Sequence, residues 1–234
     1  MKHSKRYNVA YTMFDRQKRF DLNEAIKLLK SLPTSKFDET VELHFNLGVD
    51  PRKADQQIRN SLVLPHGTGK EMRVLVFAEG DKAEEAKKAG ADYVGVDDLI
   101  EKISNGWFDF DVVIATPNLM GRIGKLGRVL GPRGLMPNPK VGTVTMDIGK
   151  AVQEAKSGKI TYRVDKFGNL HIPVGKLSFD EDKLRDNIKA VLTAVLRDRP
   201  STLKGVYIKS ITLCTTMSPG IKIQVASATS EARS

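Results

Sequence analysis

Apolar side chains recur with two different periods along this chain of 234 residues. In residues 41–47, "VELHFNL", every second side chain is apolar, which is typical of a strand with one buried face. Residues 73–78, "RVLVFA", are apolar almost without a break, which is typical of a strand covered on both faces. The sequence therefore predicts two kinds of β-sheet.

The segments outside residues 70–159 predict helices combined with antiparallel strands. Asp21 at a cap position and Glu24 three residues later indicate a helix over 21–33. The other expected elements are strands over 39–51 and 58–65, a hairpin with strands over 159–165 and 169–175, a long amphipathic helix over 180–200, and a strand pair over 206–217 and 220–227. These segments are typical of an α+β domain with an antiparallel sheet.

Strands and helices alternate in the middle of the chain. Strands are expected over 73–78, 92–96 and 111–117, and helices over 81–91, 97–106 and 147–158. Such alternation is typical of a parallel sheet with helices on both faces. We therefore expect a discontinuous α+β domain, residues 1–69 and 160–234, into which a Rossmann-like three-layer α/β domain, residues 70–159, is inserted.

Charge is divided unevenly between these two regions. The chain has 38 Lys and Arg against 28 Asp and Glu, a net charge of +10. Residues 70–159 hold 14 basic and 13 acidic residues, whereas the flanking segments hold 24 basic and 15 acidic residues. Basic residues can serve solubility alone, but an excess confined to one domain favours a polyanionic partner.

The composition argues against several other classes of protein. Cys214 is the one cysteine and cannot form an intramolecular disulfide, and the four histidines show no metal-binding spacing. We therefore expect neither a metal nor a cofactor. No apolar run approaches the roughly 20 residues of a membrane span, and the N-terminus lacks the apolar core of a secretory signal. We expect a cytoplasmic protein without a membrane partner.

The glycine-rich, basic stretch Gly121–Lys140 raises the alternative of a nucleotide-dependent enzyme. Its first glycines recur every third residue, unlike those of the dinucleotide-binding motif. The segment "HGTGK" at 66–70 lacks the earlier glycine and the following hydroxyl of a P-loop. Asp97 and Asp98 occupy a helix start, where carboxylates complement the helix dipole, so no catalytic set is recognised. A protein without catalytic activity is favoured over that alternative.

The segment "SKFDETVE" offers RNA-binding chemistry. Lys36 can neutralise a phosphate and Phe37 can stack on a base, just before a strand whose outward positions carry Thr40 or Glu42. Phe37 can equally be a core residue. His44 and His171, on two expected strands, can each face either a ligand or solvent.

The segment "CTTMSPG" at 214–220 is the second candidate. Its hydroxyls can bond to a ribose or a base edge, and Met217 can pack on a sugar. Threonines also suit strands, and Ser-Pro-Gly suits a turn.

Five long motifs, in order over nearly the whole chain, resemble the ribosomal protein L-one family in its bacterial form. They are "SKFDETVELHFNLGVDPRKADQQIR", "LPHGTGK", "GRVLGPRGLMPNPKVGTVT", "GKITYRVDKFGNLHIPVGK" and "TTMSPGIKI". The resemblance implies a component of the large ribosomal subunit whose discontinuous basic domain binds the mobile stalk of large-subunit ribosomal RNA. It also implies a role in the release of exit-site transfer RNA, and repression of translation by binding the protein's own messenger RNA.

The resemblance also implies a set of RNA-binding residues. They are Lys36, Phe37, Thr40, Glu42, His171, Thr215, Thr216, Met217 and Ser218. Ser218 stands where the family usually has glycine. Either the backbone tolerates its Cβ, with Gly220 absorbing the turn, or the local contact differs.

The glycine-rich stretch itself carries a second expectation. Its basic side chains predict a secondary RNA contact from Arg122, Lys125, Arg128, Arg133 and Lys140. Its glycines and prolines can equally pack the stretch against its own sheet.

Overall fold

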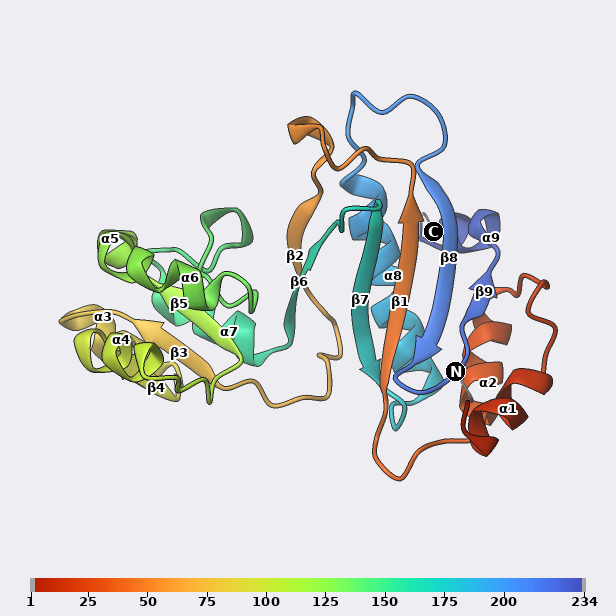
Figure 1. The fold of residues 1–234 in the computed structure, drawn as a ribbon, viewed down its shortest axis with the longest axis horizontal. Coiled ribbons are helices and arrows are strands. Elements are labelled where there is room, and N and C mark those ends of the chain that lie inside the picture. The colour runs from red at the N-terminus through yellow and green to blue at the C-terminus, as the bar shows by residue number, and fades with distance from the viewer. Residues whose placement is uncertain (1–2, 233–234) are drawn as a thin grey trace. The chain divides into compact units, whose positions relative to one another are not determined.

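The computed structural model describes residues 3–232, and the chain divides into two compact units (Figure 1). We call residues 1–69 and 160–234 the basic unit, and residues 70–159 the inserted unit. The fold class predicted from the sequence, a discontinuous α+β part with an antiparallel sheet and an inserted α/β part with a parallel sheet, is confirmed.

The basic unit is built around an antiparallel sheet of four strands in the order β7-β1-β8-β9. Its elements are α1 (Lys5–Thr12), α2 (Leu22–Ser31), β1 (Thr40–Leu47), the 3-10 turn η1 (Ala54–Gln56), β2 (Arg59–Val63), β6 (Lys159–Arg163, whose first residue belongs to the inserted unit), β7 (Asn169–Lys176), α8 (Glu181–Arg197), β8 (Ile208–Thr215), β9 (Ile221–Ile223) and α9 (Val225–Glu231). Leu43 of β1 lies opposite Ile172 of β7 and Leu213 of β8, which fixes the register.

One face of this sheet is buried against helices and the other is polar. Val41, Leu43, Phe45 and Leu47 of β1 are buried in a core shared with α2 and α8, and Figure 1 shows α8 behind β7 and β1. Each such side chain contributes about 1.5–3 kcal/mol of transfer free energy. A slip of one residue would expose all four, so the alternation also holds the register.

The inserted unit contains a parallel sheet in the order β4-β3-β5. Its elements are β3 (Val74–Phe77), α3 (Asp81–Lys88), β4 (Tyr93–Gly95), α4 (Asp97–Ser104), β5 (Val112–Ala115), η2 (Pro117–Leu119), α5 (Met120–Ile123), η3 (Gly124–Leu126), α6 (Gly127–Leu130), η4 (Pro139–Val141) and α7 (Ile148–Lys156). Alternate residues of β3 face opposite cores: Leu75 and Phe77 pack on α4, and Val74 and Val76 pack on α7. The apolar run of β3 therefore reflects burial on both faces.

The first half of the glycine-rich stretch, residues 121–130, forms short helical turns, and residues 131–138 form a turn and irregular chain. Ile123, Leu126 and Leu130 are buried in the core that also contains Leu75. Their spacing of three and four residues places them on one side of these turns.

Two local predictions are wrong, and a third is confirmed in position only. Strands β6 and β7 do not pair as a hairpin: β6 pairs with β2, and β7 pairs with β1. Residues Val225–Glu231, which overlap the end of the strand expected over 220–227, form the helix α9. Asp21 adopts the extended conformation of an N-cap, but its side chain makes no capping hydrogen bond.

Within residues 3–232, no helix is long and apolar enough to cross a membrane.

Candidate nucleic-acid interface

The buried carboxylate of Glu39 organises the end of the sheet where β1 begins and β8 ends. Glu39 is 1% exposed, and one of its oxygens accepts hydrogen bonds from the Thr215 hydroxyl at 2.5 Å and from the backbone N–H of Met217 at 3.0 Å. Its other oxygen accepts from the backbone N–H of Ser35 at 2.7 Å, and Arg6 lies 3.5 Å away. One carboxylate therefore joins the segment before β1 to the turn after β8.

Glu39 is ionised because these donors outweigh its burial. Burial raises the pKa of Glu39, whereas the hydrogen bonds from Thr215, Ser35 and Met217 lower it. The lowering is the larger effect, so the pKa of Glu39 lies below its ordinary value. A carboxylate with several donors is stable in a buried position only while those donors remain in place.

Two threonines hold the same strand end together by backbone and side-chain hydrogen bonds. The N–H of Thr216 donates to the carbonyl oxygen of Thr40, and the N–H of Thr40 donates to the hydroxyl oxygen of Thr216, both at 3.1 Å. The ammonium group of Lys176, opposite Thr40 on β7, donates to the Thr40 hydroxyl at 3.0 Å. The Thr216 hydroxyl can also donate to the Thr40 carbonyl oxygen, but the two oxygens are 3.5 Å apart, a long contact that a stronger acceptor can replace.

Two large apolar side chains are exposed beside this hydrogen-bonded strand end. Phe37 is 54% exposed and Met217 is 49% exposed. The reading of Phe37 as a core residue does not hold in this structure. Lys36 is exposed next to Phe37, and it forms no ion pair with any residue of 3–232. We call such an exposed basic side chain without an ion pair an open cation. An aromatic ring, a thioether and an open cation thus lie beside the polar strand end.

Ser218 closes the turn with its own side chain. Its hydroxyl accepts from the N–H of Thr215 at 2.8 Å, and its N–H donates to the carbonyl oxygen of Thr215 at 3.2 Å. No non-glycine residue among 3–232 has a positive φ, and Gly220 is not among the glycines that do. The backbone here accommodates the Cβ of Ser218 without a left-handed residue.

Farther along the open face of the sheet, His171 meets His44. Nδ1 of His44 and Nδ1 of His171 are 2.8 Å apart, so one nitrogen donates a proton to the other. Nε2 of His44 lies 3.1 Å from Sγ of Cys214 and 3.6 Å from a carboxylate oxygen of Glu42. Burial and the nearby His171 lower the pKa of His44, against a smaller opposite effect of Glu42. Burial raises the pKa of Cys214 to about 11, which keeps the thiol protonated.

The predicted site residues therefore form one group with an extension. Lys36, Phe37, Thr40, Thr215, Thr216, Met217 and Ser218 lie at the strand end, while Glu42 and His171 lie farther along the polar face. Thr215 differs from the others because it is 4% exposed and its hydroxyl is used by Glu39.

The basic residues of the glycine-rich stretch fall into two sets. Arg122 pairs with Glu79 at 2.6 Å and also with Asp97, and the guanidinium of Arg133 lies 3.9 Å from the ring centre of Phe108. The other three, Lys125, Arg128 and Lys140, form no ion pair within residues 3–232. These three retain an open charge.

Sequence reasoning missed three groups of this site: Glu39, Lys176 and the pair of His44 with Cys214. A signal for Glu39 was present. Extending the alternation of Val41 and Leu43 back by two residues places Glu39 on the buried face, and the same extension from Leu213 buries Thr215. A carboxylate and a hydroxyl in the buried phase of neighbouring strands predict a buried hydrogen bond.

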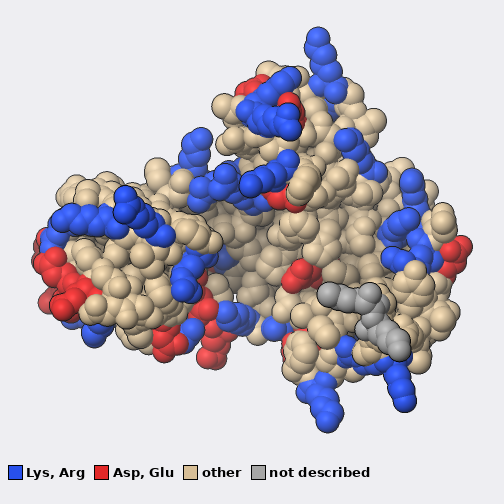
Figure 2. Space-filling model, in the orientation of Figure 1, with Lys and Arg blue, Asp and Glu red and all other residues tan. Residues whose placement is uncertain are grey.

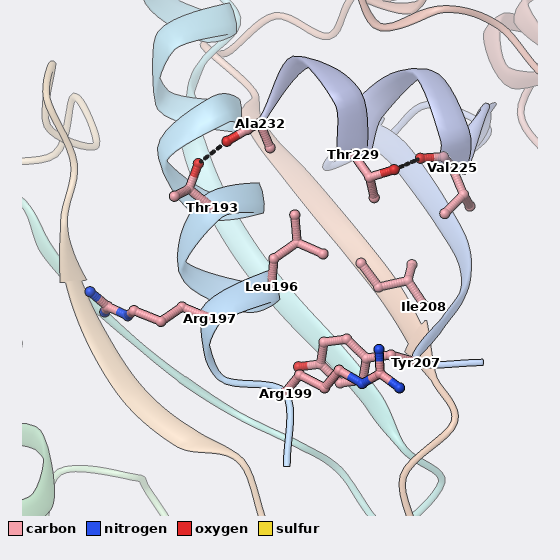
Figure 3. A pocket seen from close by; sticks show the side chains of 9 residues that line it. All are labelled: Thr193, Leu196, Arg197, Arg199, Tyr207, Ile208, Val225, Thr229 and Ala232. Carbon is pink, nitrogen blue, oxygen red and sulfur yellow. Dashed lines mark hydrogen bonds between the residues drawn. The ribbon is translucent and has the colours of Figure 1, made fainter. Parts of the chain in front are cut away.

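A cavity of about 410 Å³ lies elsewhere in the basic unit, between α8, α9 and the start of β8 (Figure 3). Its wall is mixed: apolar side chains such as Leu196, Ile208 and Val225 alternate with two threonines and two arginines. The hydroxyls of Thr193 and Thr229 already donate to backbone oxygens there. None of the predicted site residues lines it.

No group of three or more possible metal-binding side chains occurs in the described part of the chain.

Fold and site together define a two-domain basic protein of mixed α/β structure, with polar strand ends and open cations on its basic unit. Comparison with known proteins gives the family. Residues 28–219 match the ribosomal protein L1p/L10e family. Two similar proteins, each named "large ribosomal subunit protein uL1", come from Thermosipho melanesiensis and Thermosipho africanus; each is 61% identical over 229 residues, 97% of this chain and 99% of the relative. The chain belongs to this family, which consists of ribosomal proteins and not of enzymes.

Proposed function

We propose that this protein is a structural component of the large ribosomal subunit that binds the stalk of its ribosomal RNA through the strand end around Glu39. One observation carries the proposal: Phe37 and Met217 are exposed beside the strand end that Glu39 holds together by hydrogen bonds, on the more basic of the two units. Phe37 stacks on a base, Met217 packs on a sugar, and the Thr216 hydroxyl donates to the RNA backbone. Thr215 acts through Glu39 by fixing the position of Met217.

A matched pair of methionines tests this proposal. Met217 in the basic unit is 49% exposed and Met146 in the inserted unit is 51% exposed. With a stalk fragment of large-subunit ribosomal RNA, Met217→Ala is expected to weaken binding about tenfold, a loss typical of one contact in a tightly packed interface. Met146→Ala should bind like the wild type. Equal affinities for the two variants would contradict the proposal.

The Thr216 hydroxyl has its own control. Thr216→Ser keeps the hydroxyl, whereas Thr216→Val removes it and leaves the Thr40 N–H without its acceptor. We expect weaker RNA binding for the valine variant and nearly normal binding for the serine variant. Unchanged affinity of the valine variant would show that this hydroxyl does not contact RNA.

The resemblance supports two finer roles, which we propose here: participation in the release of exit-site transfer RNA, and repression of translation from the protein's own messenger RNA. For repression, the same strand end would bind a similar RNA structure in the messenger. The stalk fragment should then compete with the leader of that messenger for one site, and Met217→Ala should weaken both complexes equally. Simultaneous binding of both RNAs would contradict a shared site.

For transfer RNA release, ribosomes carrying the protein should lose deacylated transfer RNA at a different rate from ribosomes lacking it. The open cations Lys125, Arg128 and Lys140 are the proposed secondary RNA contact, because Arg122 and Arg133 are already engaged within the inserted unit.

A further inference from the structure

The opposite end of the same sheet, where β1 ends and β7 and β8 begin, carries a second surface. The N–H of Leu47 donates to the carbonyl oxygen of Gly168 at 2.8 Å, and that of Gly48 donates to the carbonyl oxygen of Tyr207 at 2.7 Å. These bonds hold together the loops that we call the far-end loops: residues 48–57, 165–168 and 198–207. Because each of the eight residues of β1 rises by about 3.4 Å, this end lies about 24 Å from Thr40.

The far-end loops carry the two most exposed large apolar side chains of residues 3–232. Phe167 is 82% exposed and Val206 is 68% exposed. Phe167 is held outward by a rigid turn: the Asp165 carboxylate accepts from the N–H of Phe167 at 2.8 Å and from the N–H of Asn169 at 2.7 Å. Gly168 closes the turn with a φ of +83°, and a Cβ there would lie 3.1 Å from the carbonyl oxygen of Leu47. The ring is therefore presented to a partner rather than packed.

Open cations lie on the far-end loops and at the start of β8. Lys53, Lys166, Lys204 and Lys209 are exposed and form no ion pair within the described residues. The same loops carry four carboxylates, Asp50, Asp55, Asp165 and Asp198, each of which accepts hydrogen bonds there; Asp198 accepts from the Tyr162 hydroxyl and Asp55 from the Thr202 hydroxyl, both at 2.5 Å. Figure 2 shows Lys and Arg side chains over this end of the basic unit, at the top of the view. With Arg52 and Arg199, which are also exposed, the basic side chains of this end outnumber its carboxylates by six to four, and an exposed aromatic ring beside cations suits a nucleic acid.

We propose that the far-end loops form a second RNA-binding surface, on which Phe167 stacks on an unpaired base and the four lysines contact the flanking phosphates. A lysine followed by an exposed phenylalanine occurs at both ends of the sheet, as Lys36 with Phe37 and as Lys166 with Phe167. Stacking tolerates any base and the lysines supply charge, so this surface recognises single-stranded or loop RNA with little sequence preference. The inference rests on the proposed RNA-binding function and adds a contact about 24 Å from the first.

Photo-crosslinking in assembled large subunits tests this second surface. A benzophenone-bearing residue is placed, in separate full-length chains, at position 167, at position 37 and, as an exposed control, at position 146. We expect crosslinks to ribosomal RNA from positions 167 and 37 and none from position 146. Crosslinks from 37 alone, or crosslinks from 167 to protein only, would overturn the second surface and leave the proposed function standing. RNA crosslinks from neither 37 nor 167 would overturn both.

Equilibrium binding to full-length large-subunit ribosomal RNA separates stacking from general apolar contact. Phe167→Ala is expected to lower affinity about 5- to 100-fold, the range found for removing one aromatic stacking platform. Phe167→Leu keeps an apolar side chain without a ring face and should lose most of the same affinity; wild-type binding by this variant would overturn stacking. Lys166→Ala should reduce the salt slope by about 0.7, and an unchanged slope would overturn its phosphate contact.

Discussion

The two units of this protein differ most in how their charges are used. Within the described residues, ion pairs join seven basic residues of the inserted unit to acidic partners, out of the 14 that it contains. In the basic unit, whose segments hold 24, only Arg6, Lys183, Arg185 and Lys189 form such pairs among the described residues. Ion pairs thus engage half of the basic residues of the inserted unit, whereas most of those of the basic unit are left available to a polyanion. Unpaired charge therefore favours the same unit as net charge does, and supports the proposal that the basic unit binds RNA.

Charge reversal should have the largest effect on this comparison. Lys36→Glu combined with Lys176→Glu is expected to weaken binding of a stalk RNA fragment about 100-fold, because each change removes an attraction and adds a repulsion. The matched change in the inserted unit is Lys125→Glu with Arg128→Glu, both exposed and unpaired within residues 3–232, and it should cost less than about threefold. Affinities would be measured at constant salt. A reversed order of the two effects would make the inserted unit the principal RNA contact.

Removing the charge of Glu39 should have the next largest effect. Glu39→Gln weakens three hydrogen bonds to a buried group and is expected to lower the free energy of unfolding by about 2 to 3 kcal/mol, with a parallel loss of RNA affinity. Glu154→Gln removes an ion pair of the inserted unit in which Glu154 is 31% exposed, and should cost less than about 1 kcal/mol. Chemical denaturation of both variants measures this difference. An equal loss in the free energy of unfolding for the two variants would show that Glu39 does not organise the strand end.

Acid should weaken the inserted unit through Asp111. Burial raises the pKa of Asp111, but hydrogen bonds from Lys70 and Arg73 lower it to about 2. Because the folded pKa lies below the unfolded value, this stability is present above about pH 4 and is lost as the pH falls toward 2. Asp111→Asn is expected to cost about 1 to 2 kcal/mol at pH 7, discounted for partial exposure, and little at pH 2. Exchange of the β3 amides reports on this unit; a cost that does not change with pH would exclude the ionised carboxylate as its source.

The smallest effect concerns His44 in the basic unit. Burial and His171 lower the pKa of His44, so stability from its neutral form is present above the ordinary histidine pKa and is lost as the pH falls through the lower folded value. Titration of the ring protons by NMR should place the pKa of His44 below that of an exposed histidine, and His171→Asn should raise it. A pKa of His44 unmoved by that substitution would rule out the coupling.

The parts of the fold that could be predicted are those set by periodicity. The alternation of β1 and the continuous apolar run of β3 each reflect burial of a whole strand face, and both elements were placed correctly. Pairing between strands was less accessible: β6 and β7 flank a short turn that favours a hairpin, yet their partners β2 and β1 are distant in sequence. Local turn chemistry gives no information about such non-local pairing.

The site was predicted unevenly for a similar reason. Phe37 and Met217 were proposed from the chemistry of two short segments and from the resemblance to a known family, and the structure shows both exposed. Glu39 was missed because a buried carboxylate is identified by its donors, and these come from segments about 180 residues apart in the chain. Arg122 and Arg133 show the converse: their composition suggested open charge, and tertiary contacts engage both.

Amide hydrogen exchange of the full chain, with and without a stalk fragment of large-subunit ribosomal RNA, distinguishes RNA binding by the strand end from RNA binding by the glycine-rich stretch. We expect slower exchange on binding at Glu39 and Thr40 and at Thr215 to Met217, where the strand end is proposed to contact RNA, and a much smaller change over residues 121–140. Protection concentrated in residues 121–140, with none at the strand end, would contradict the assignment of RNA binding to the basic unit.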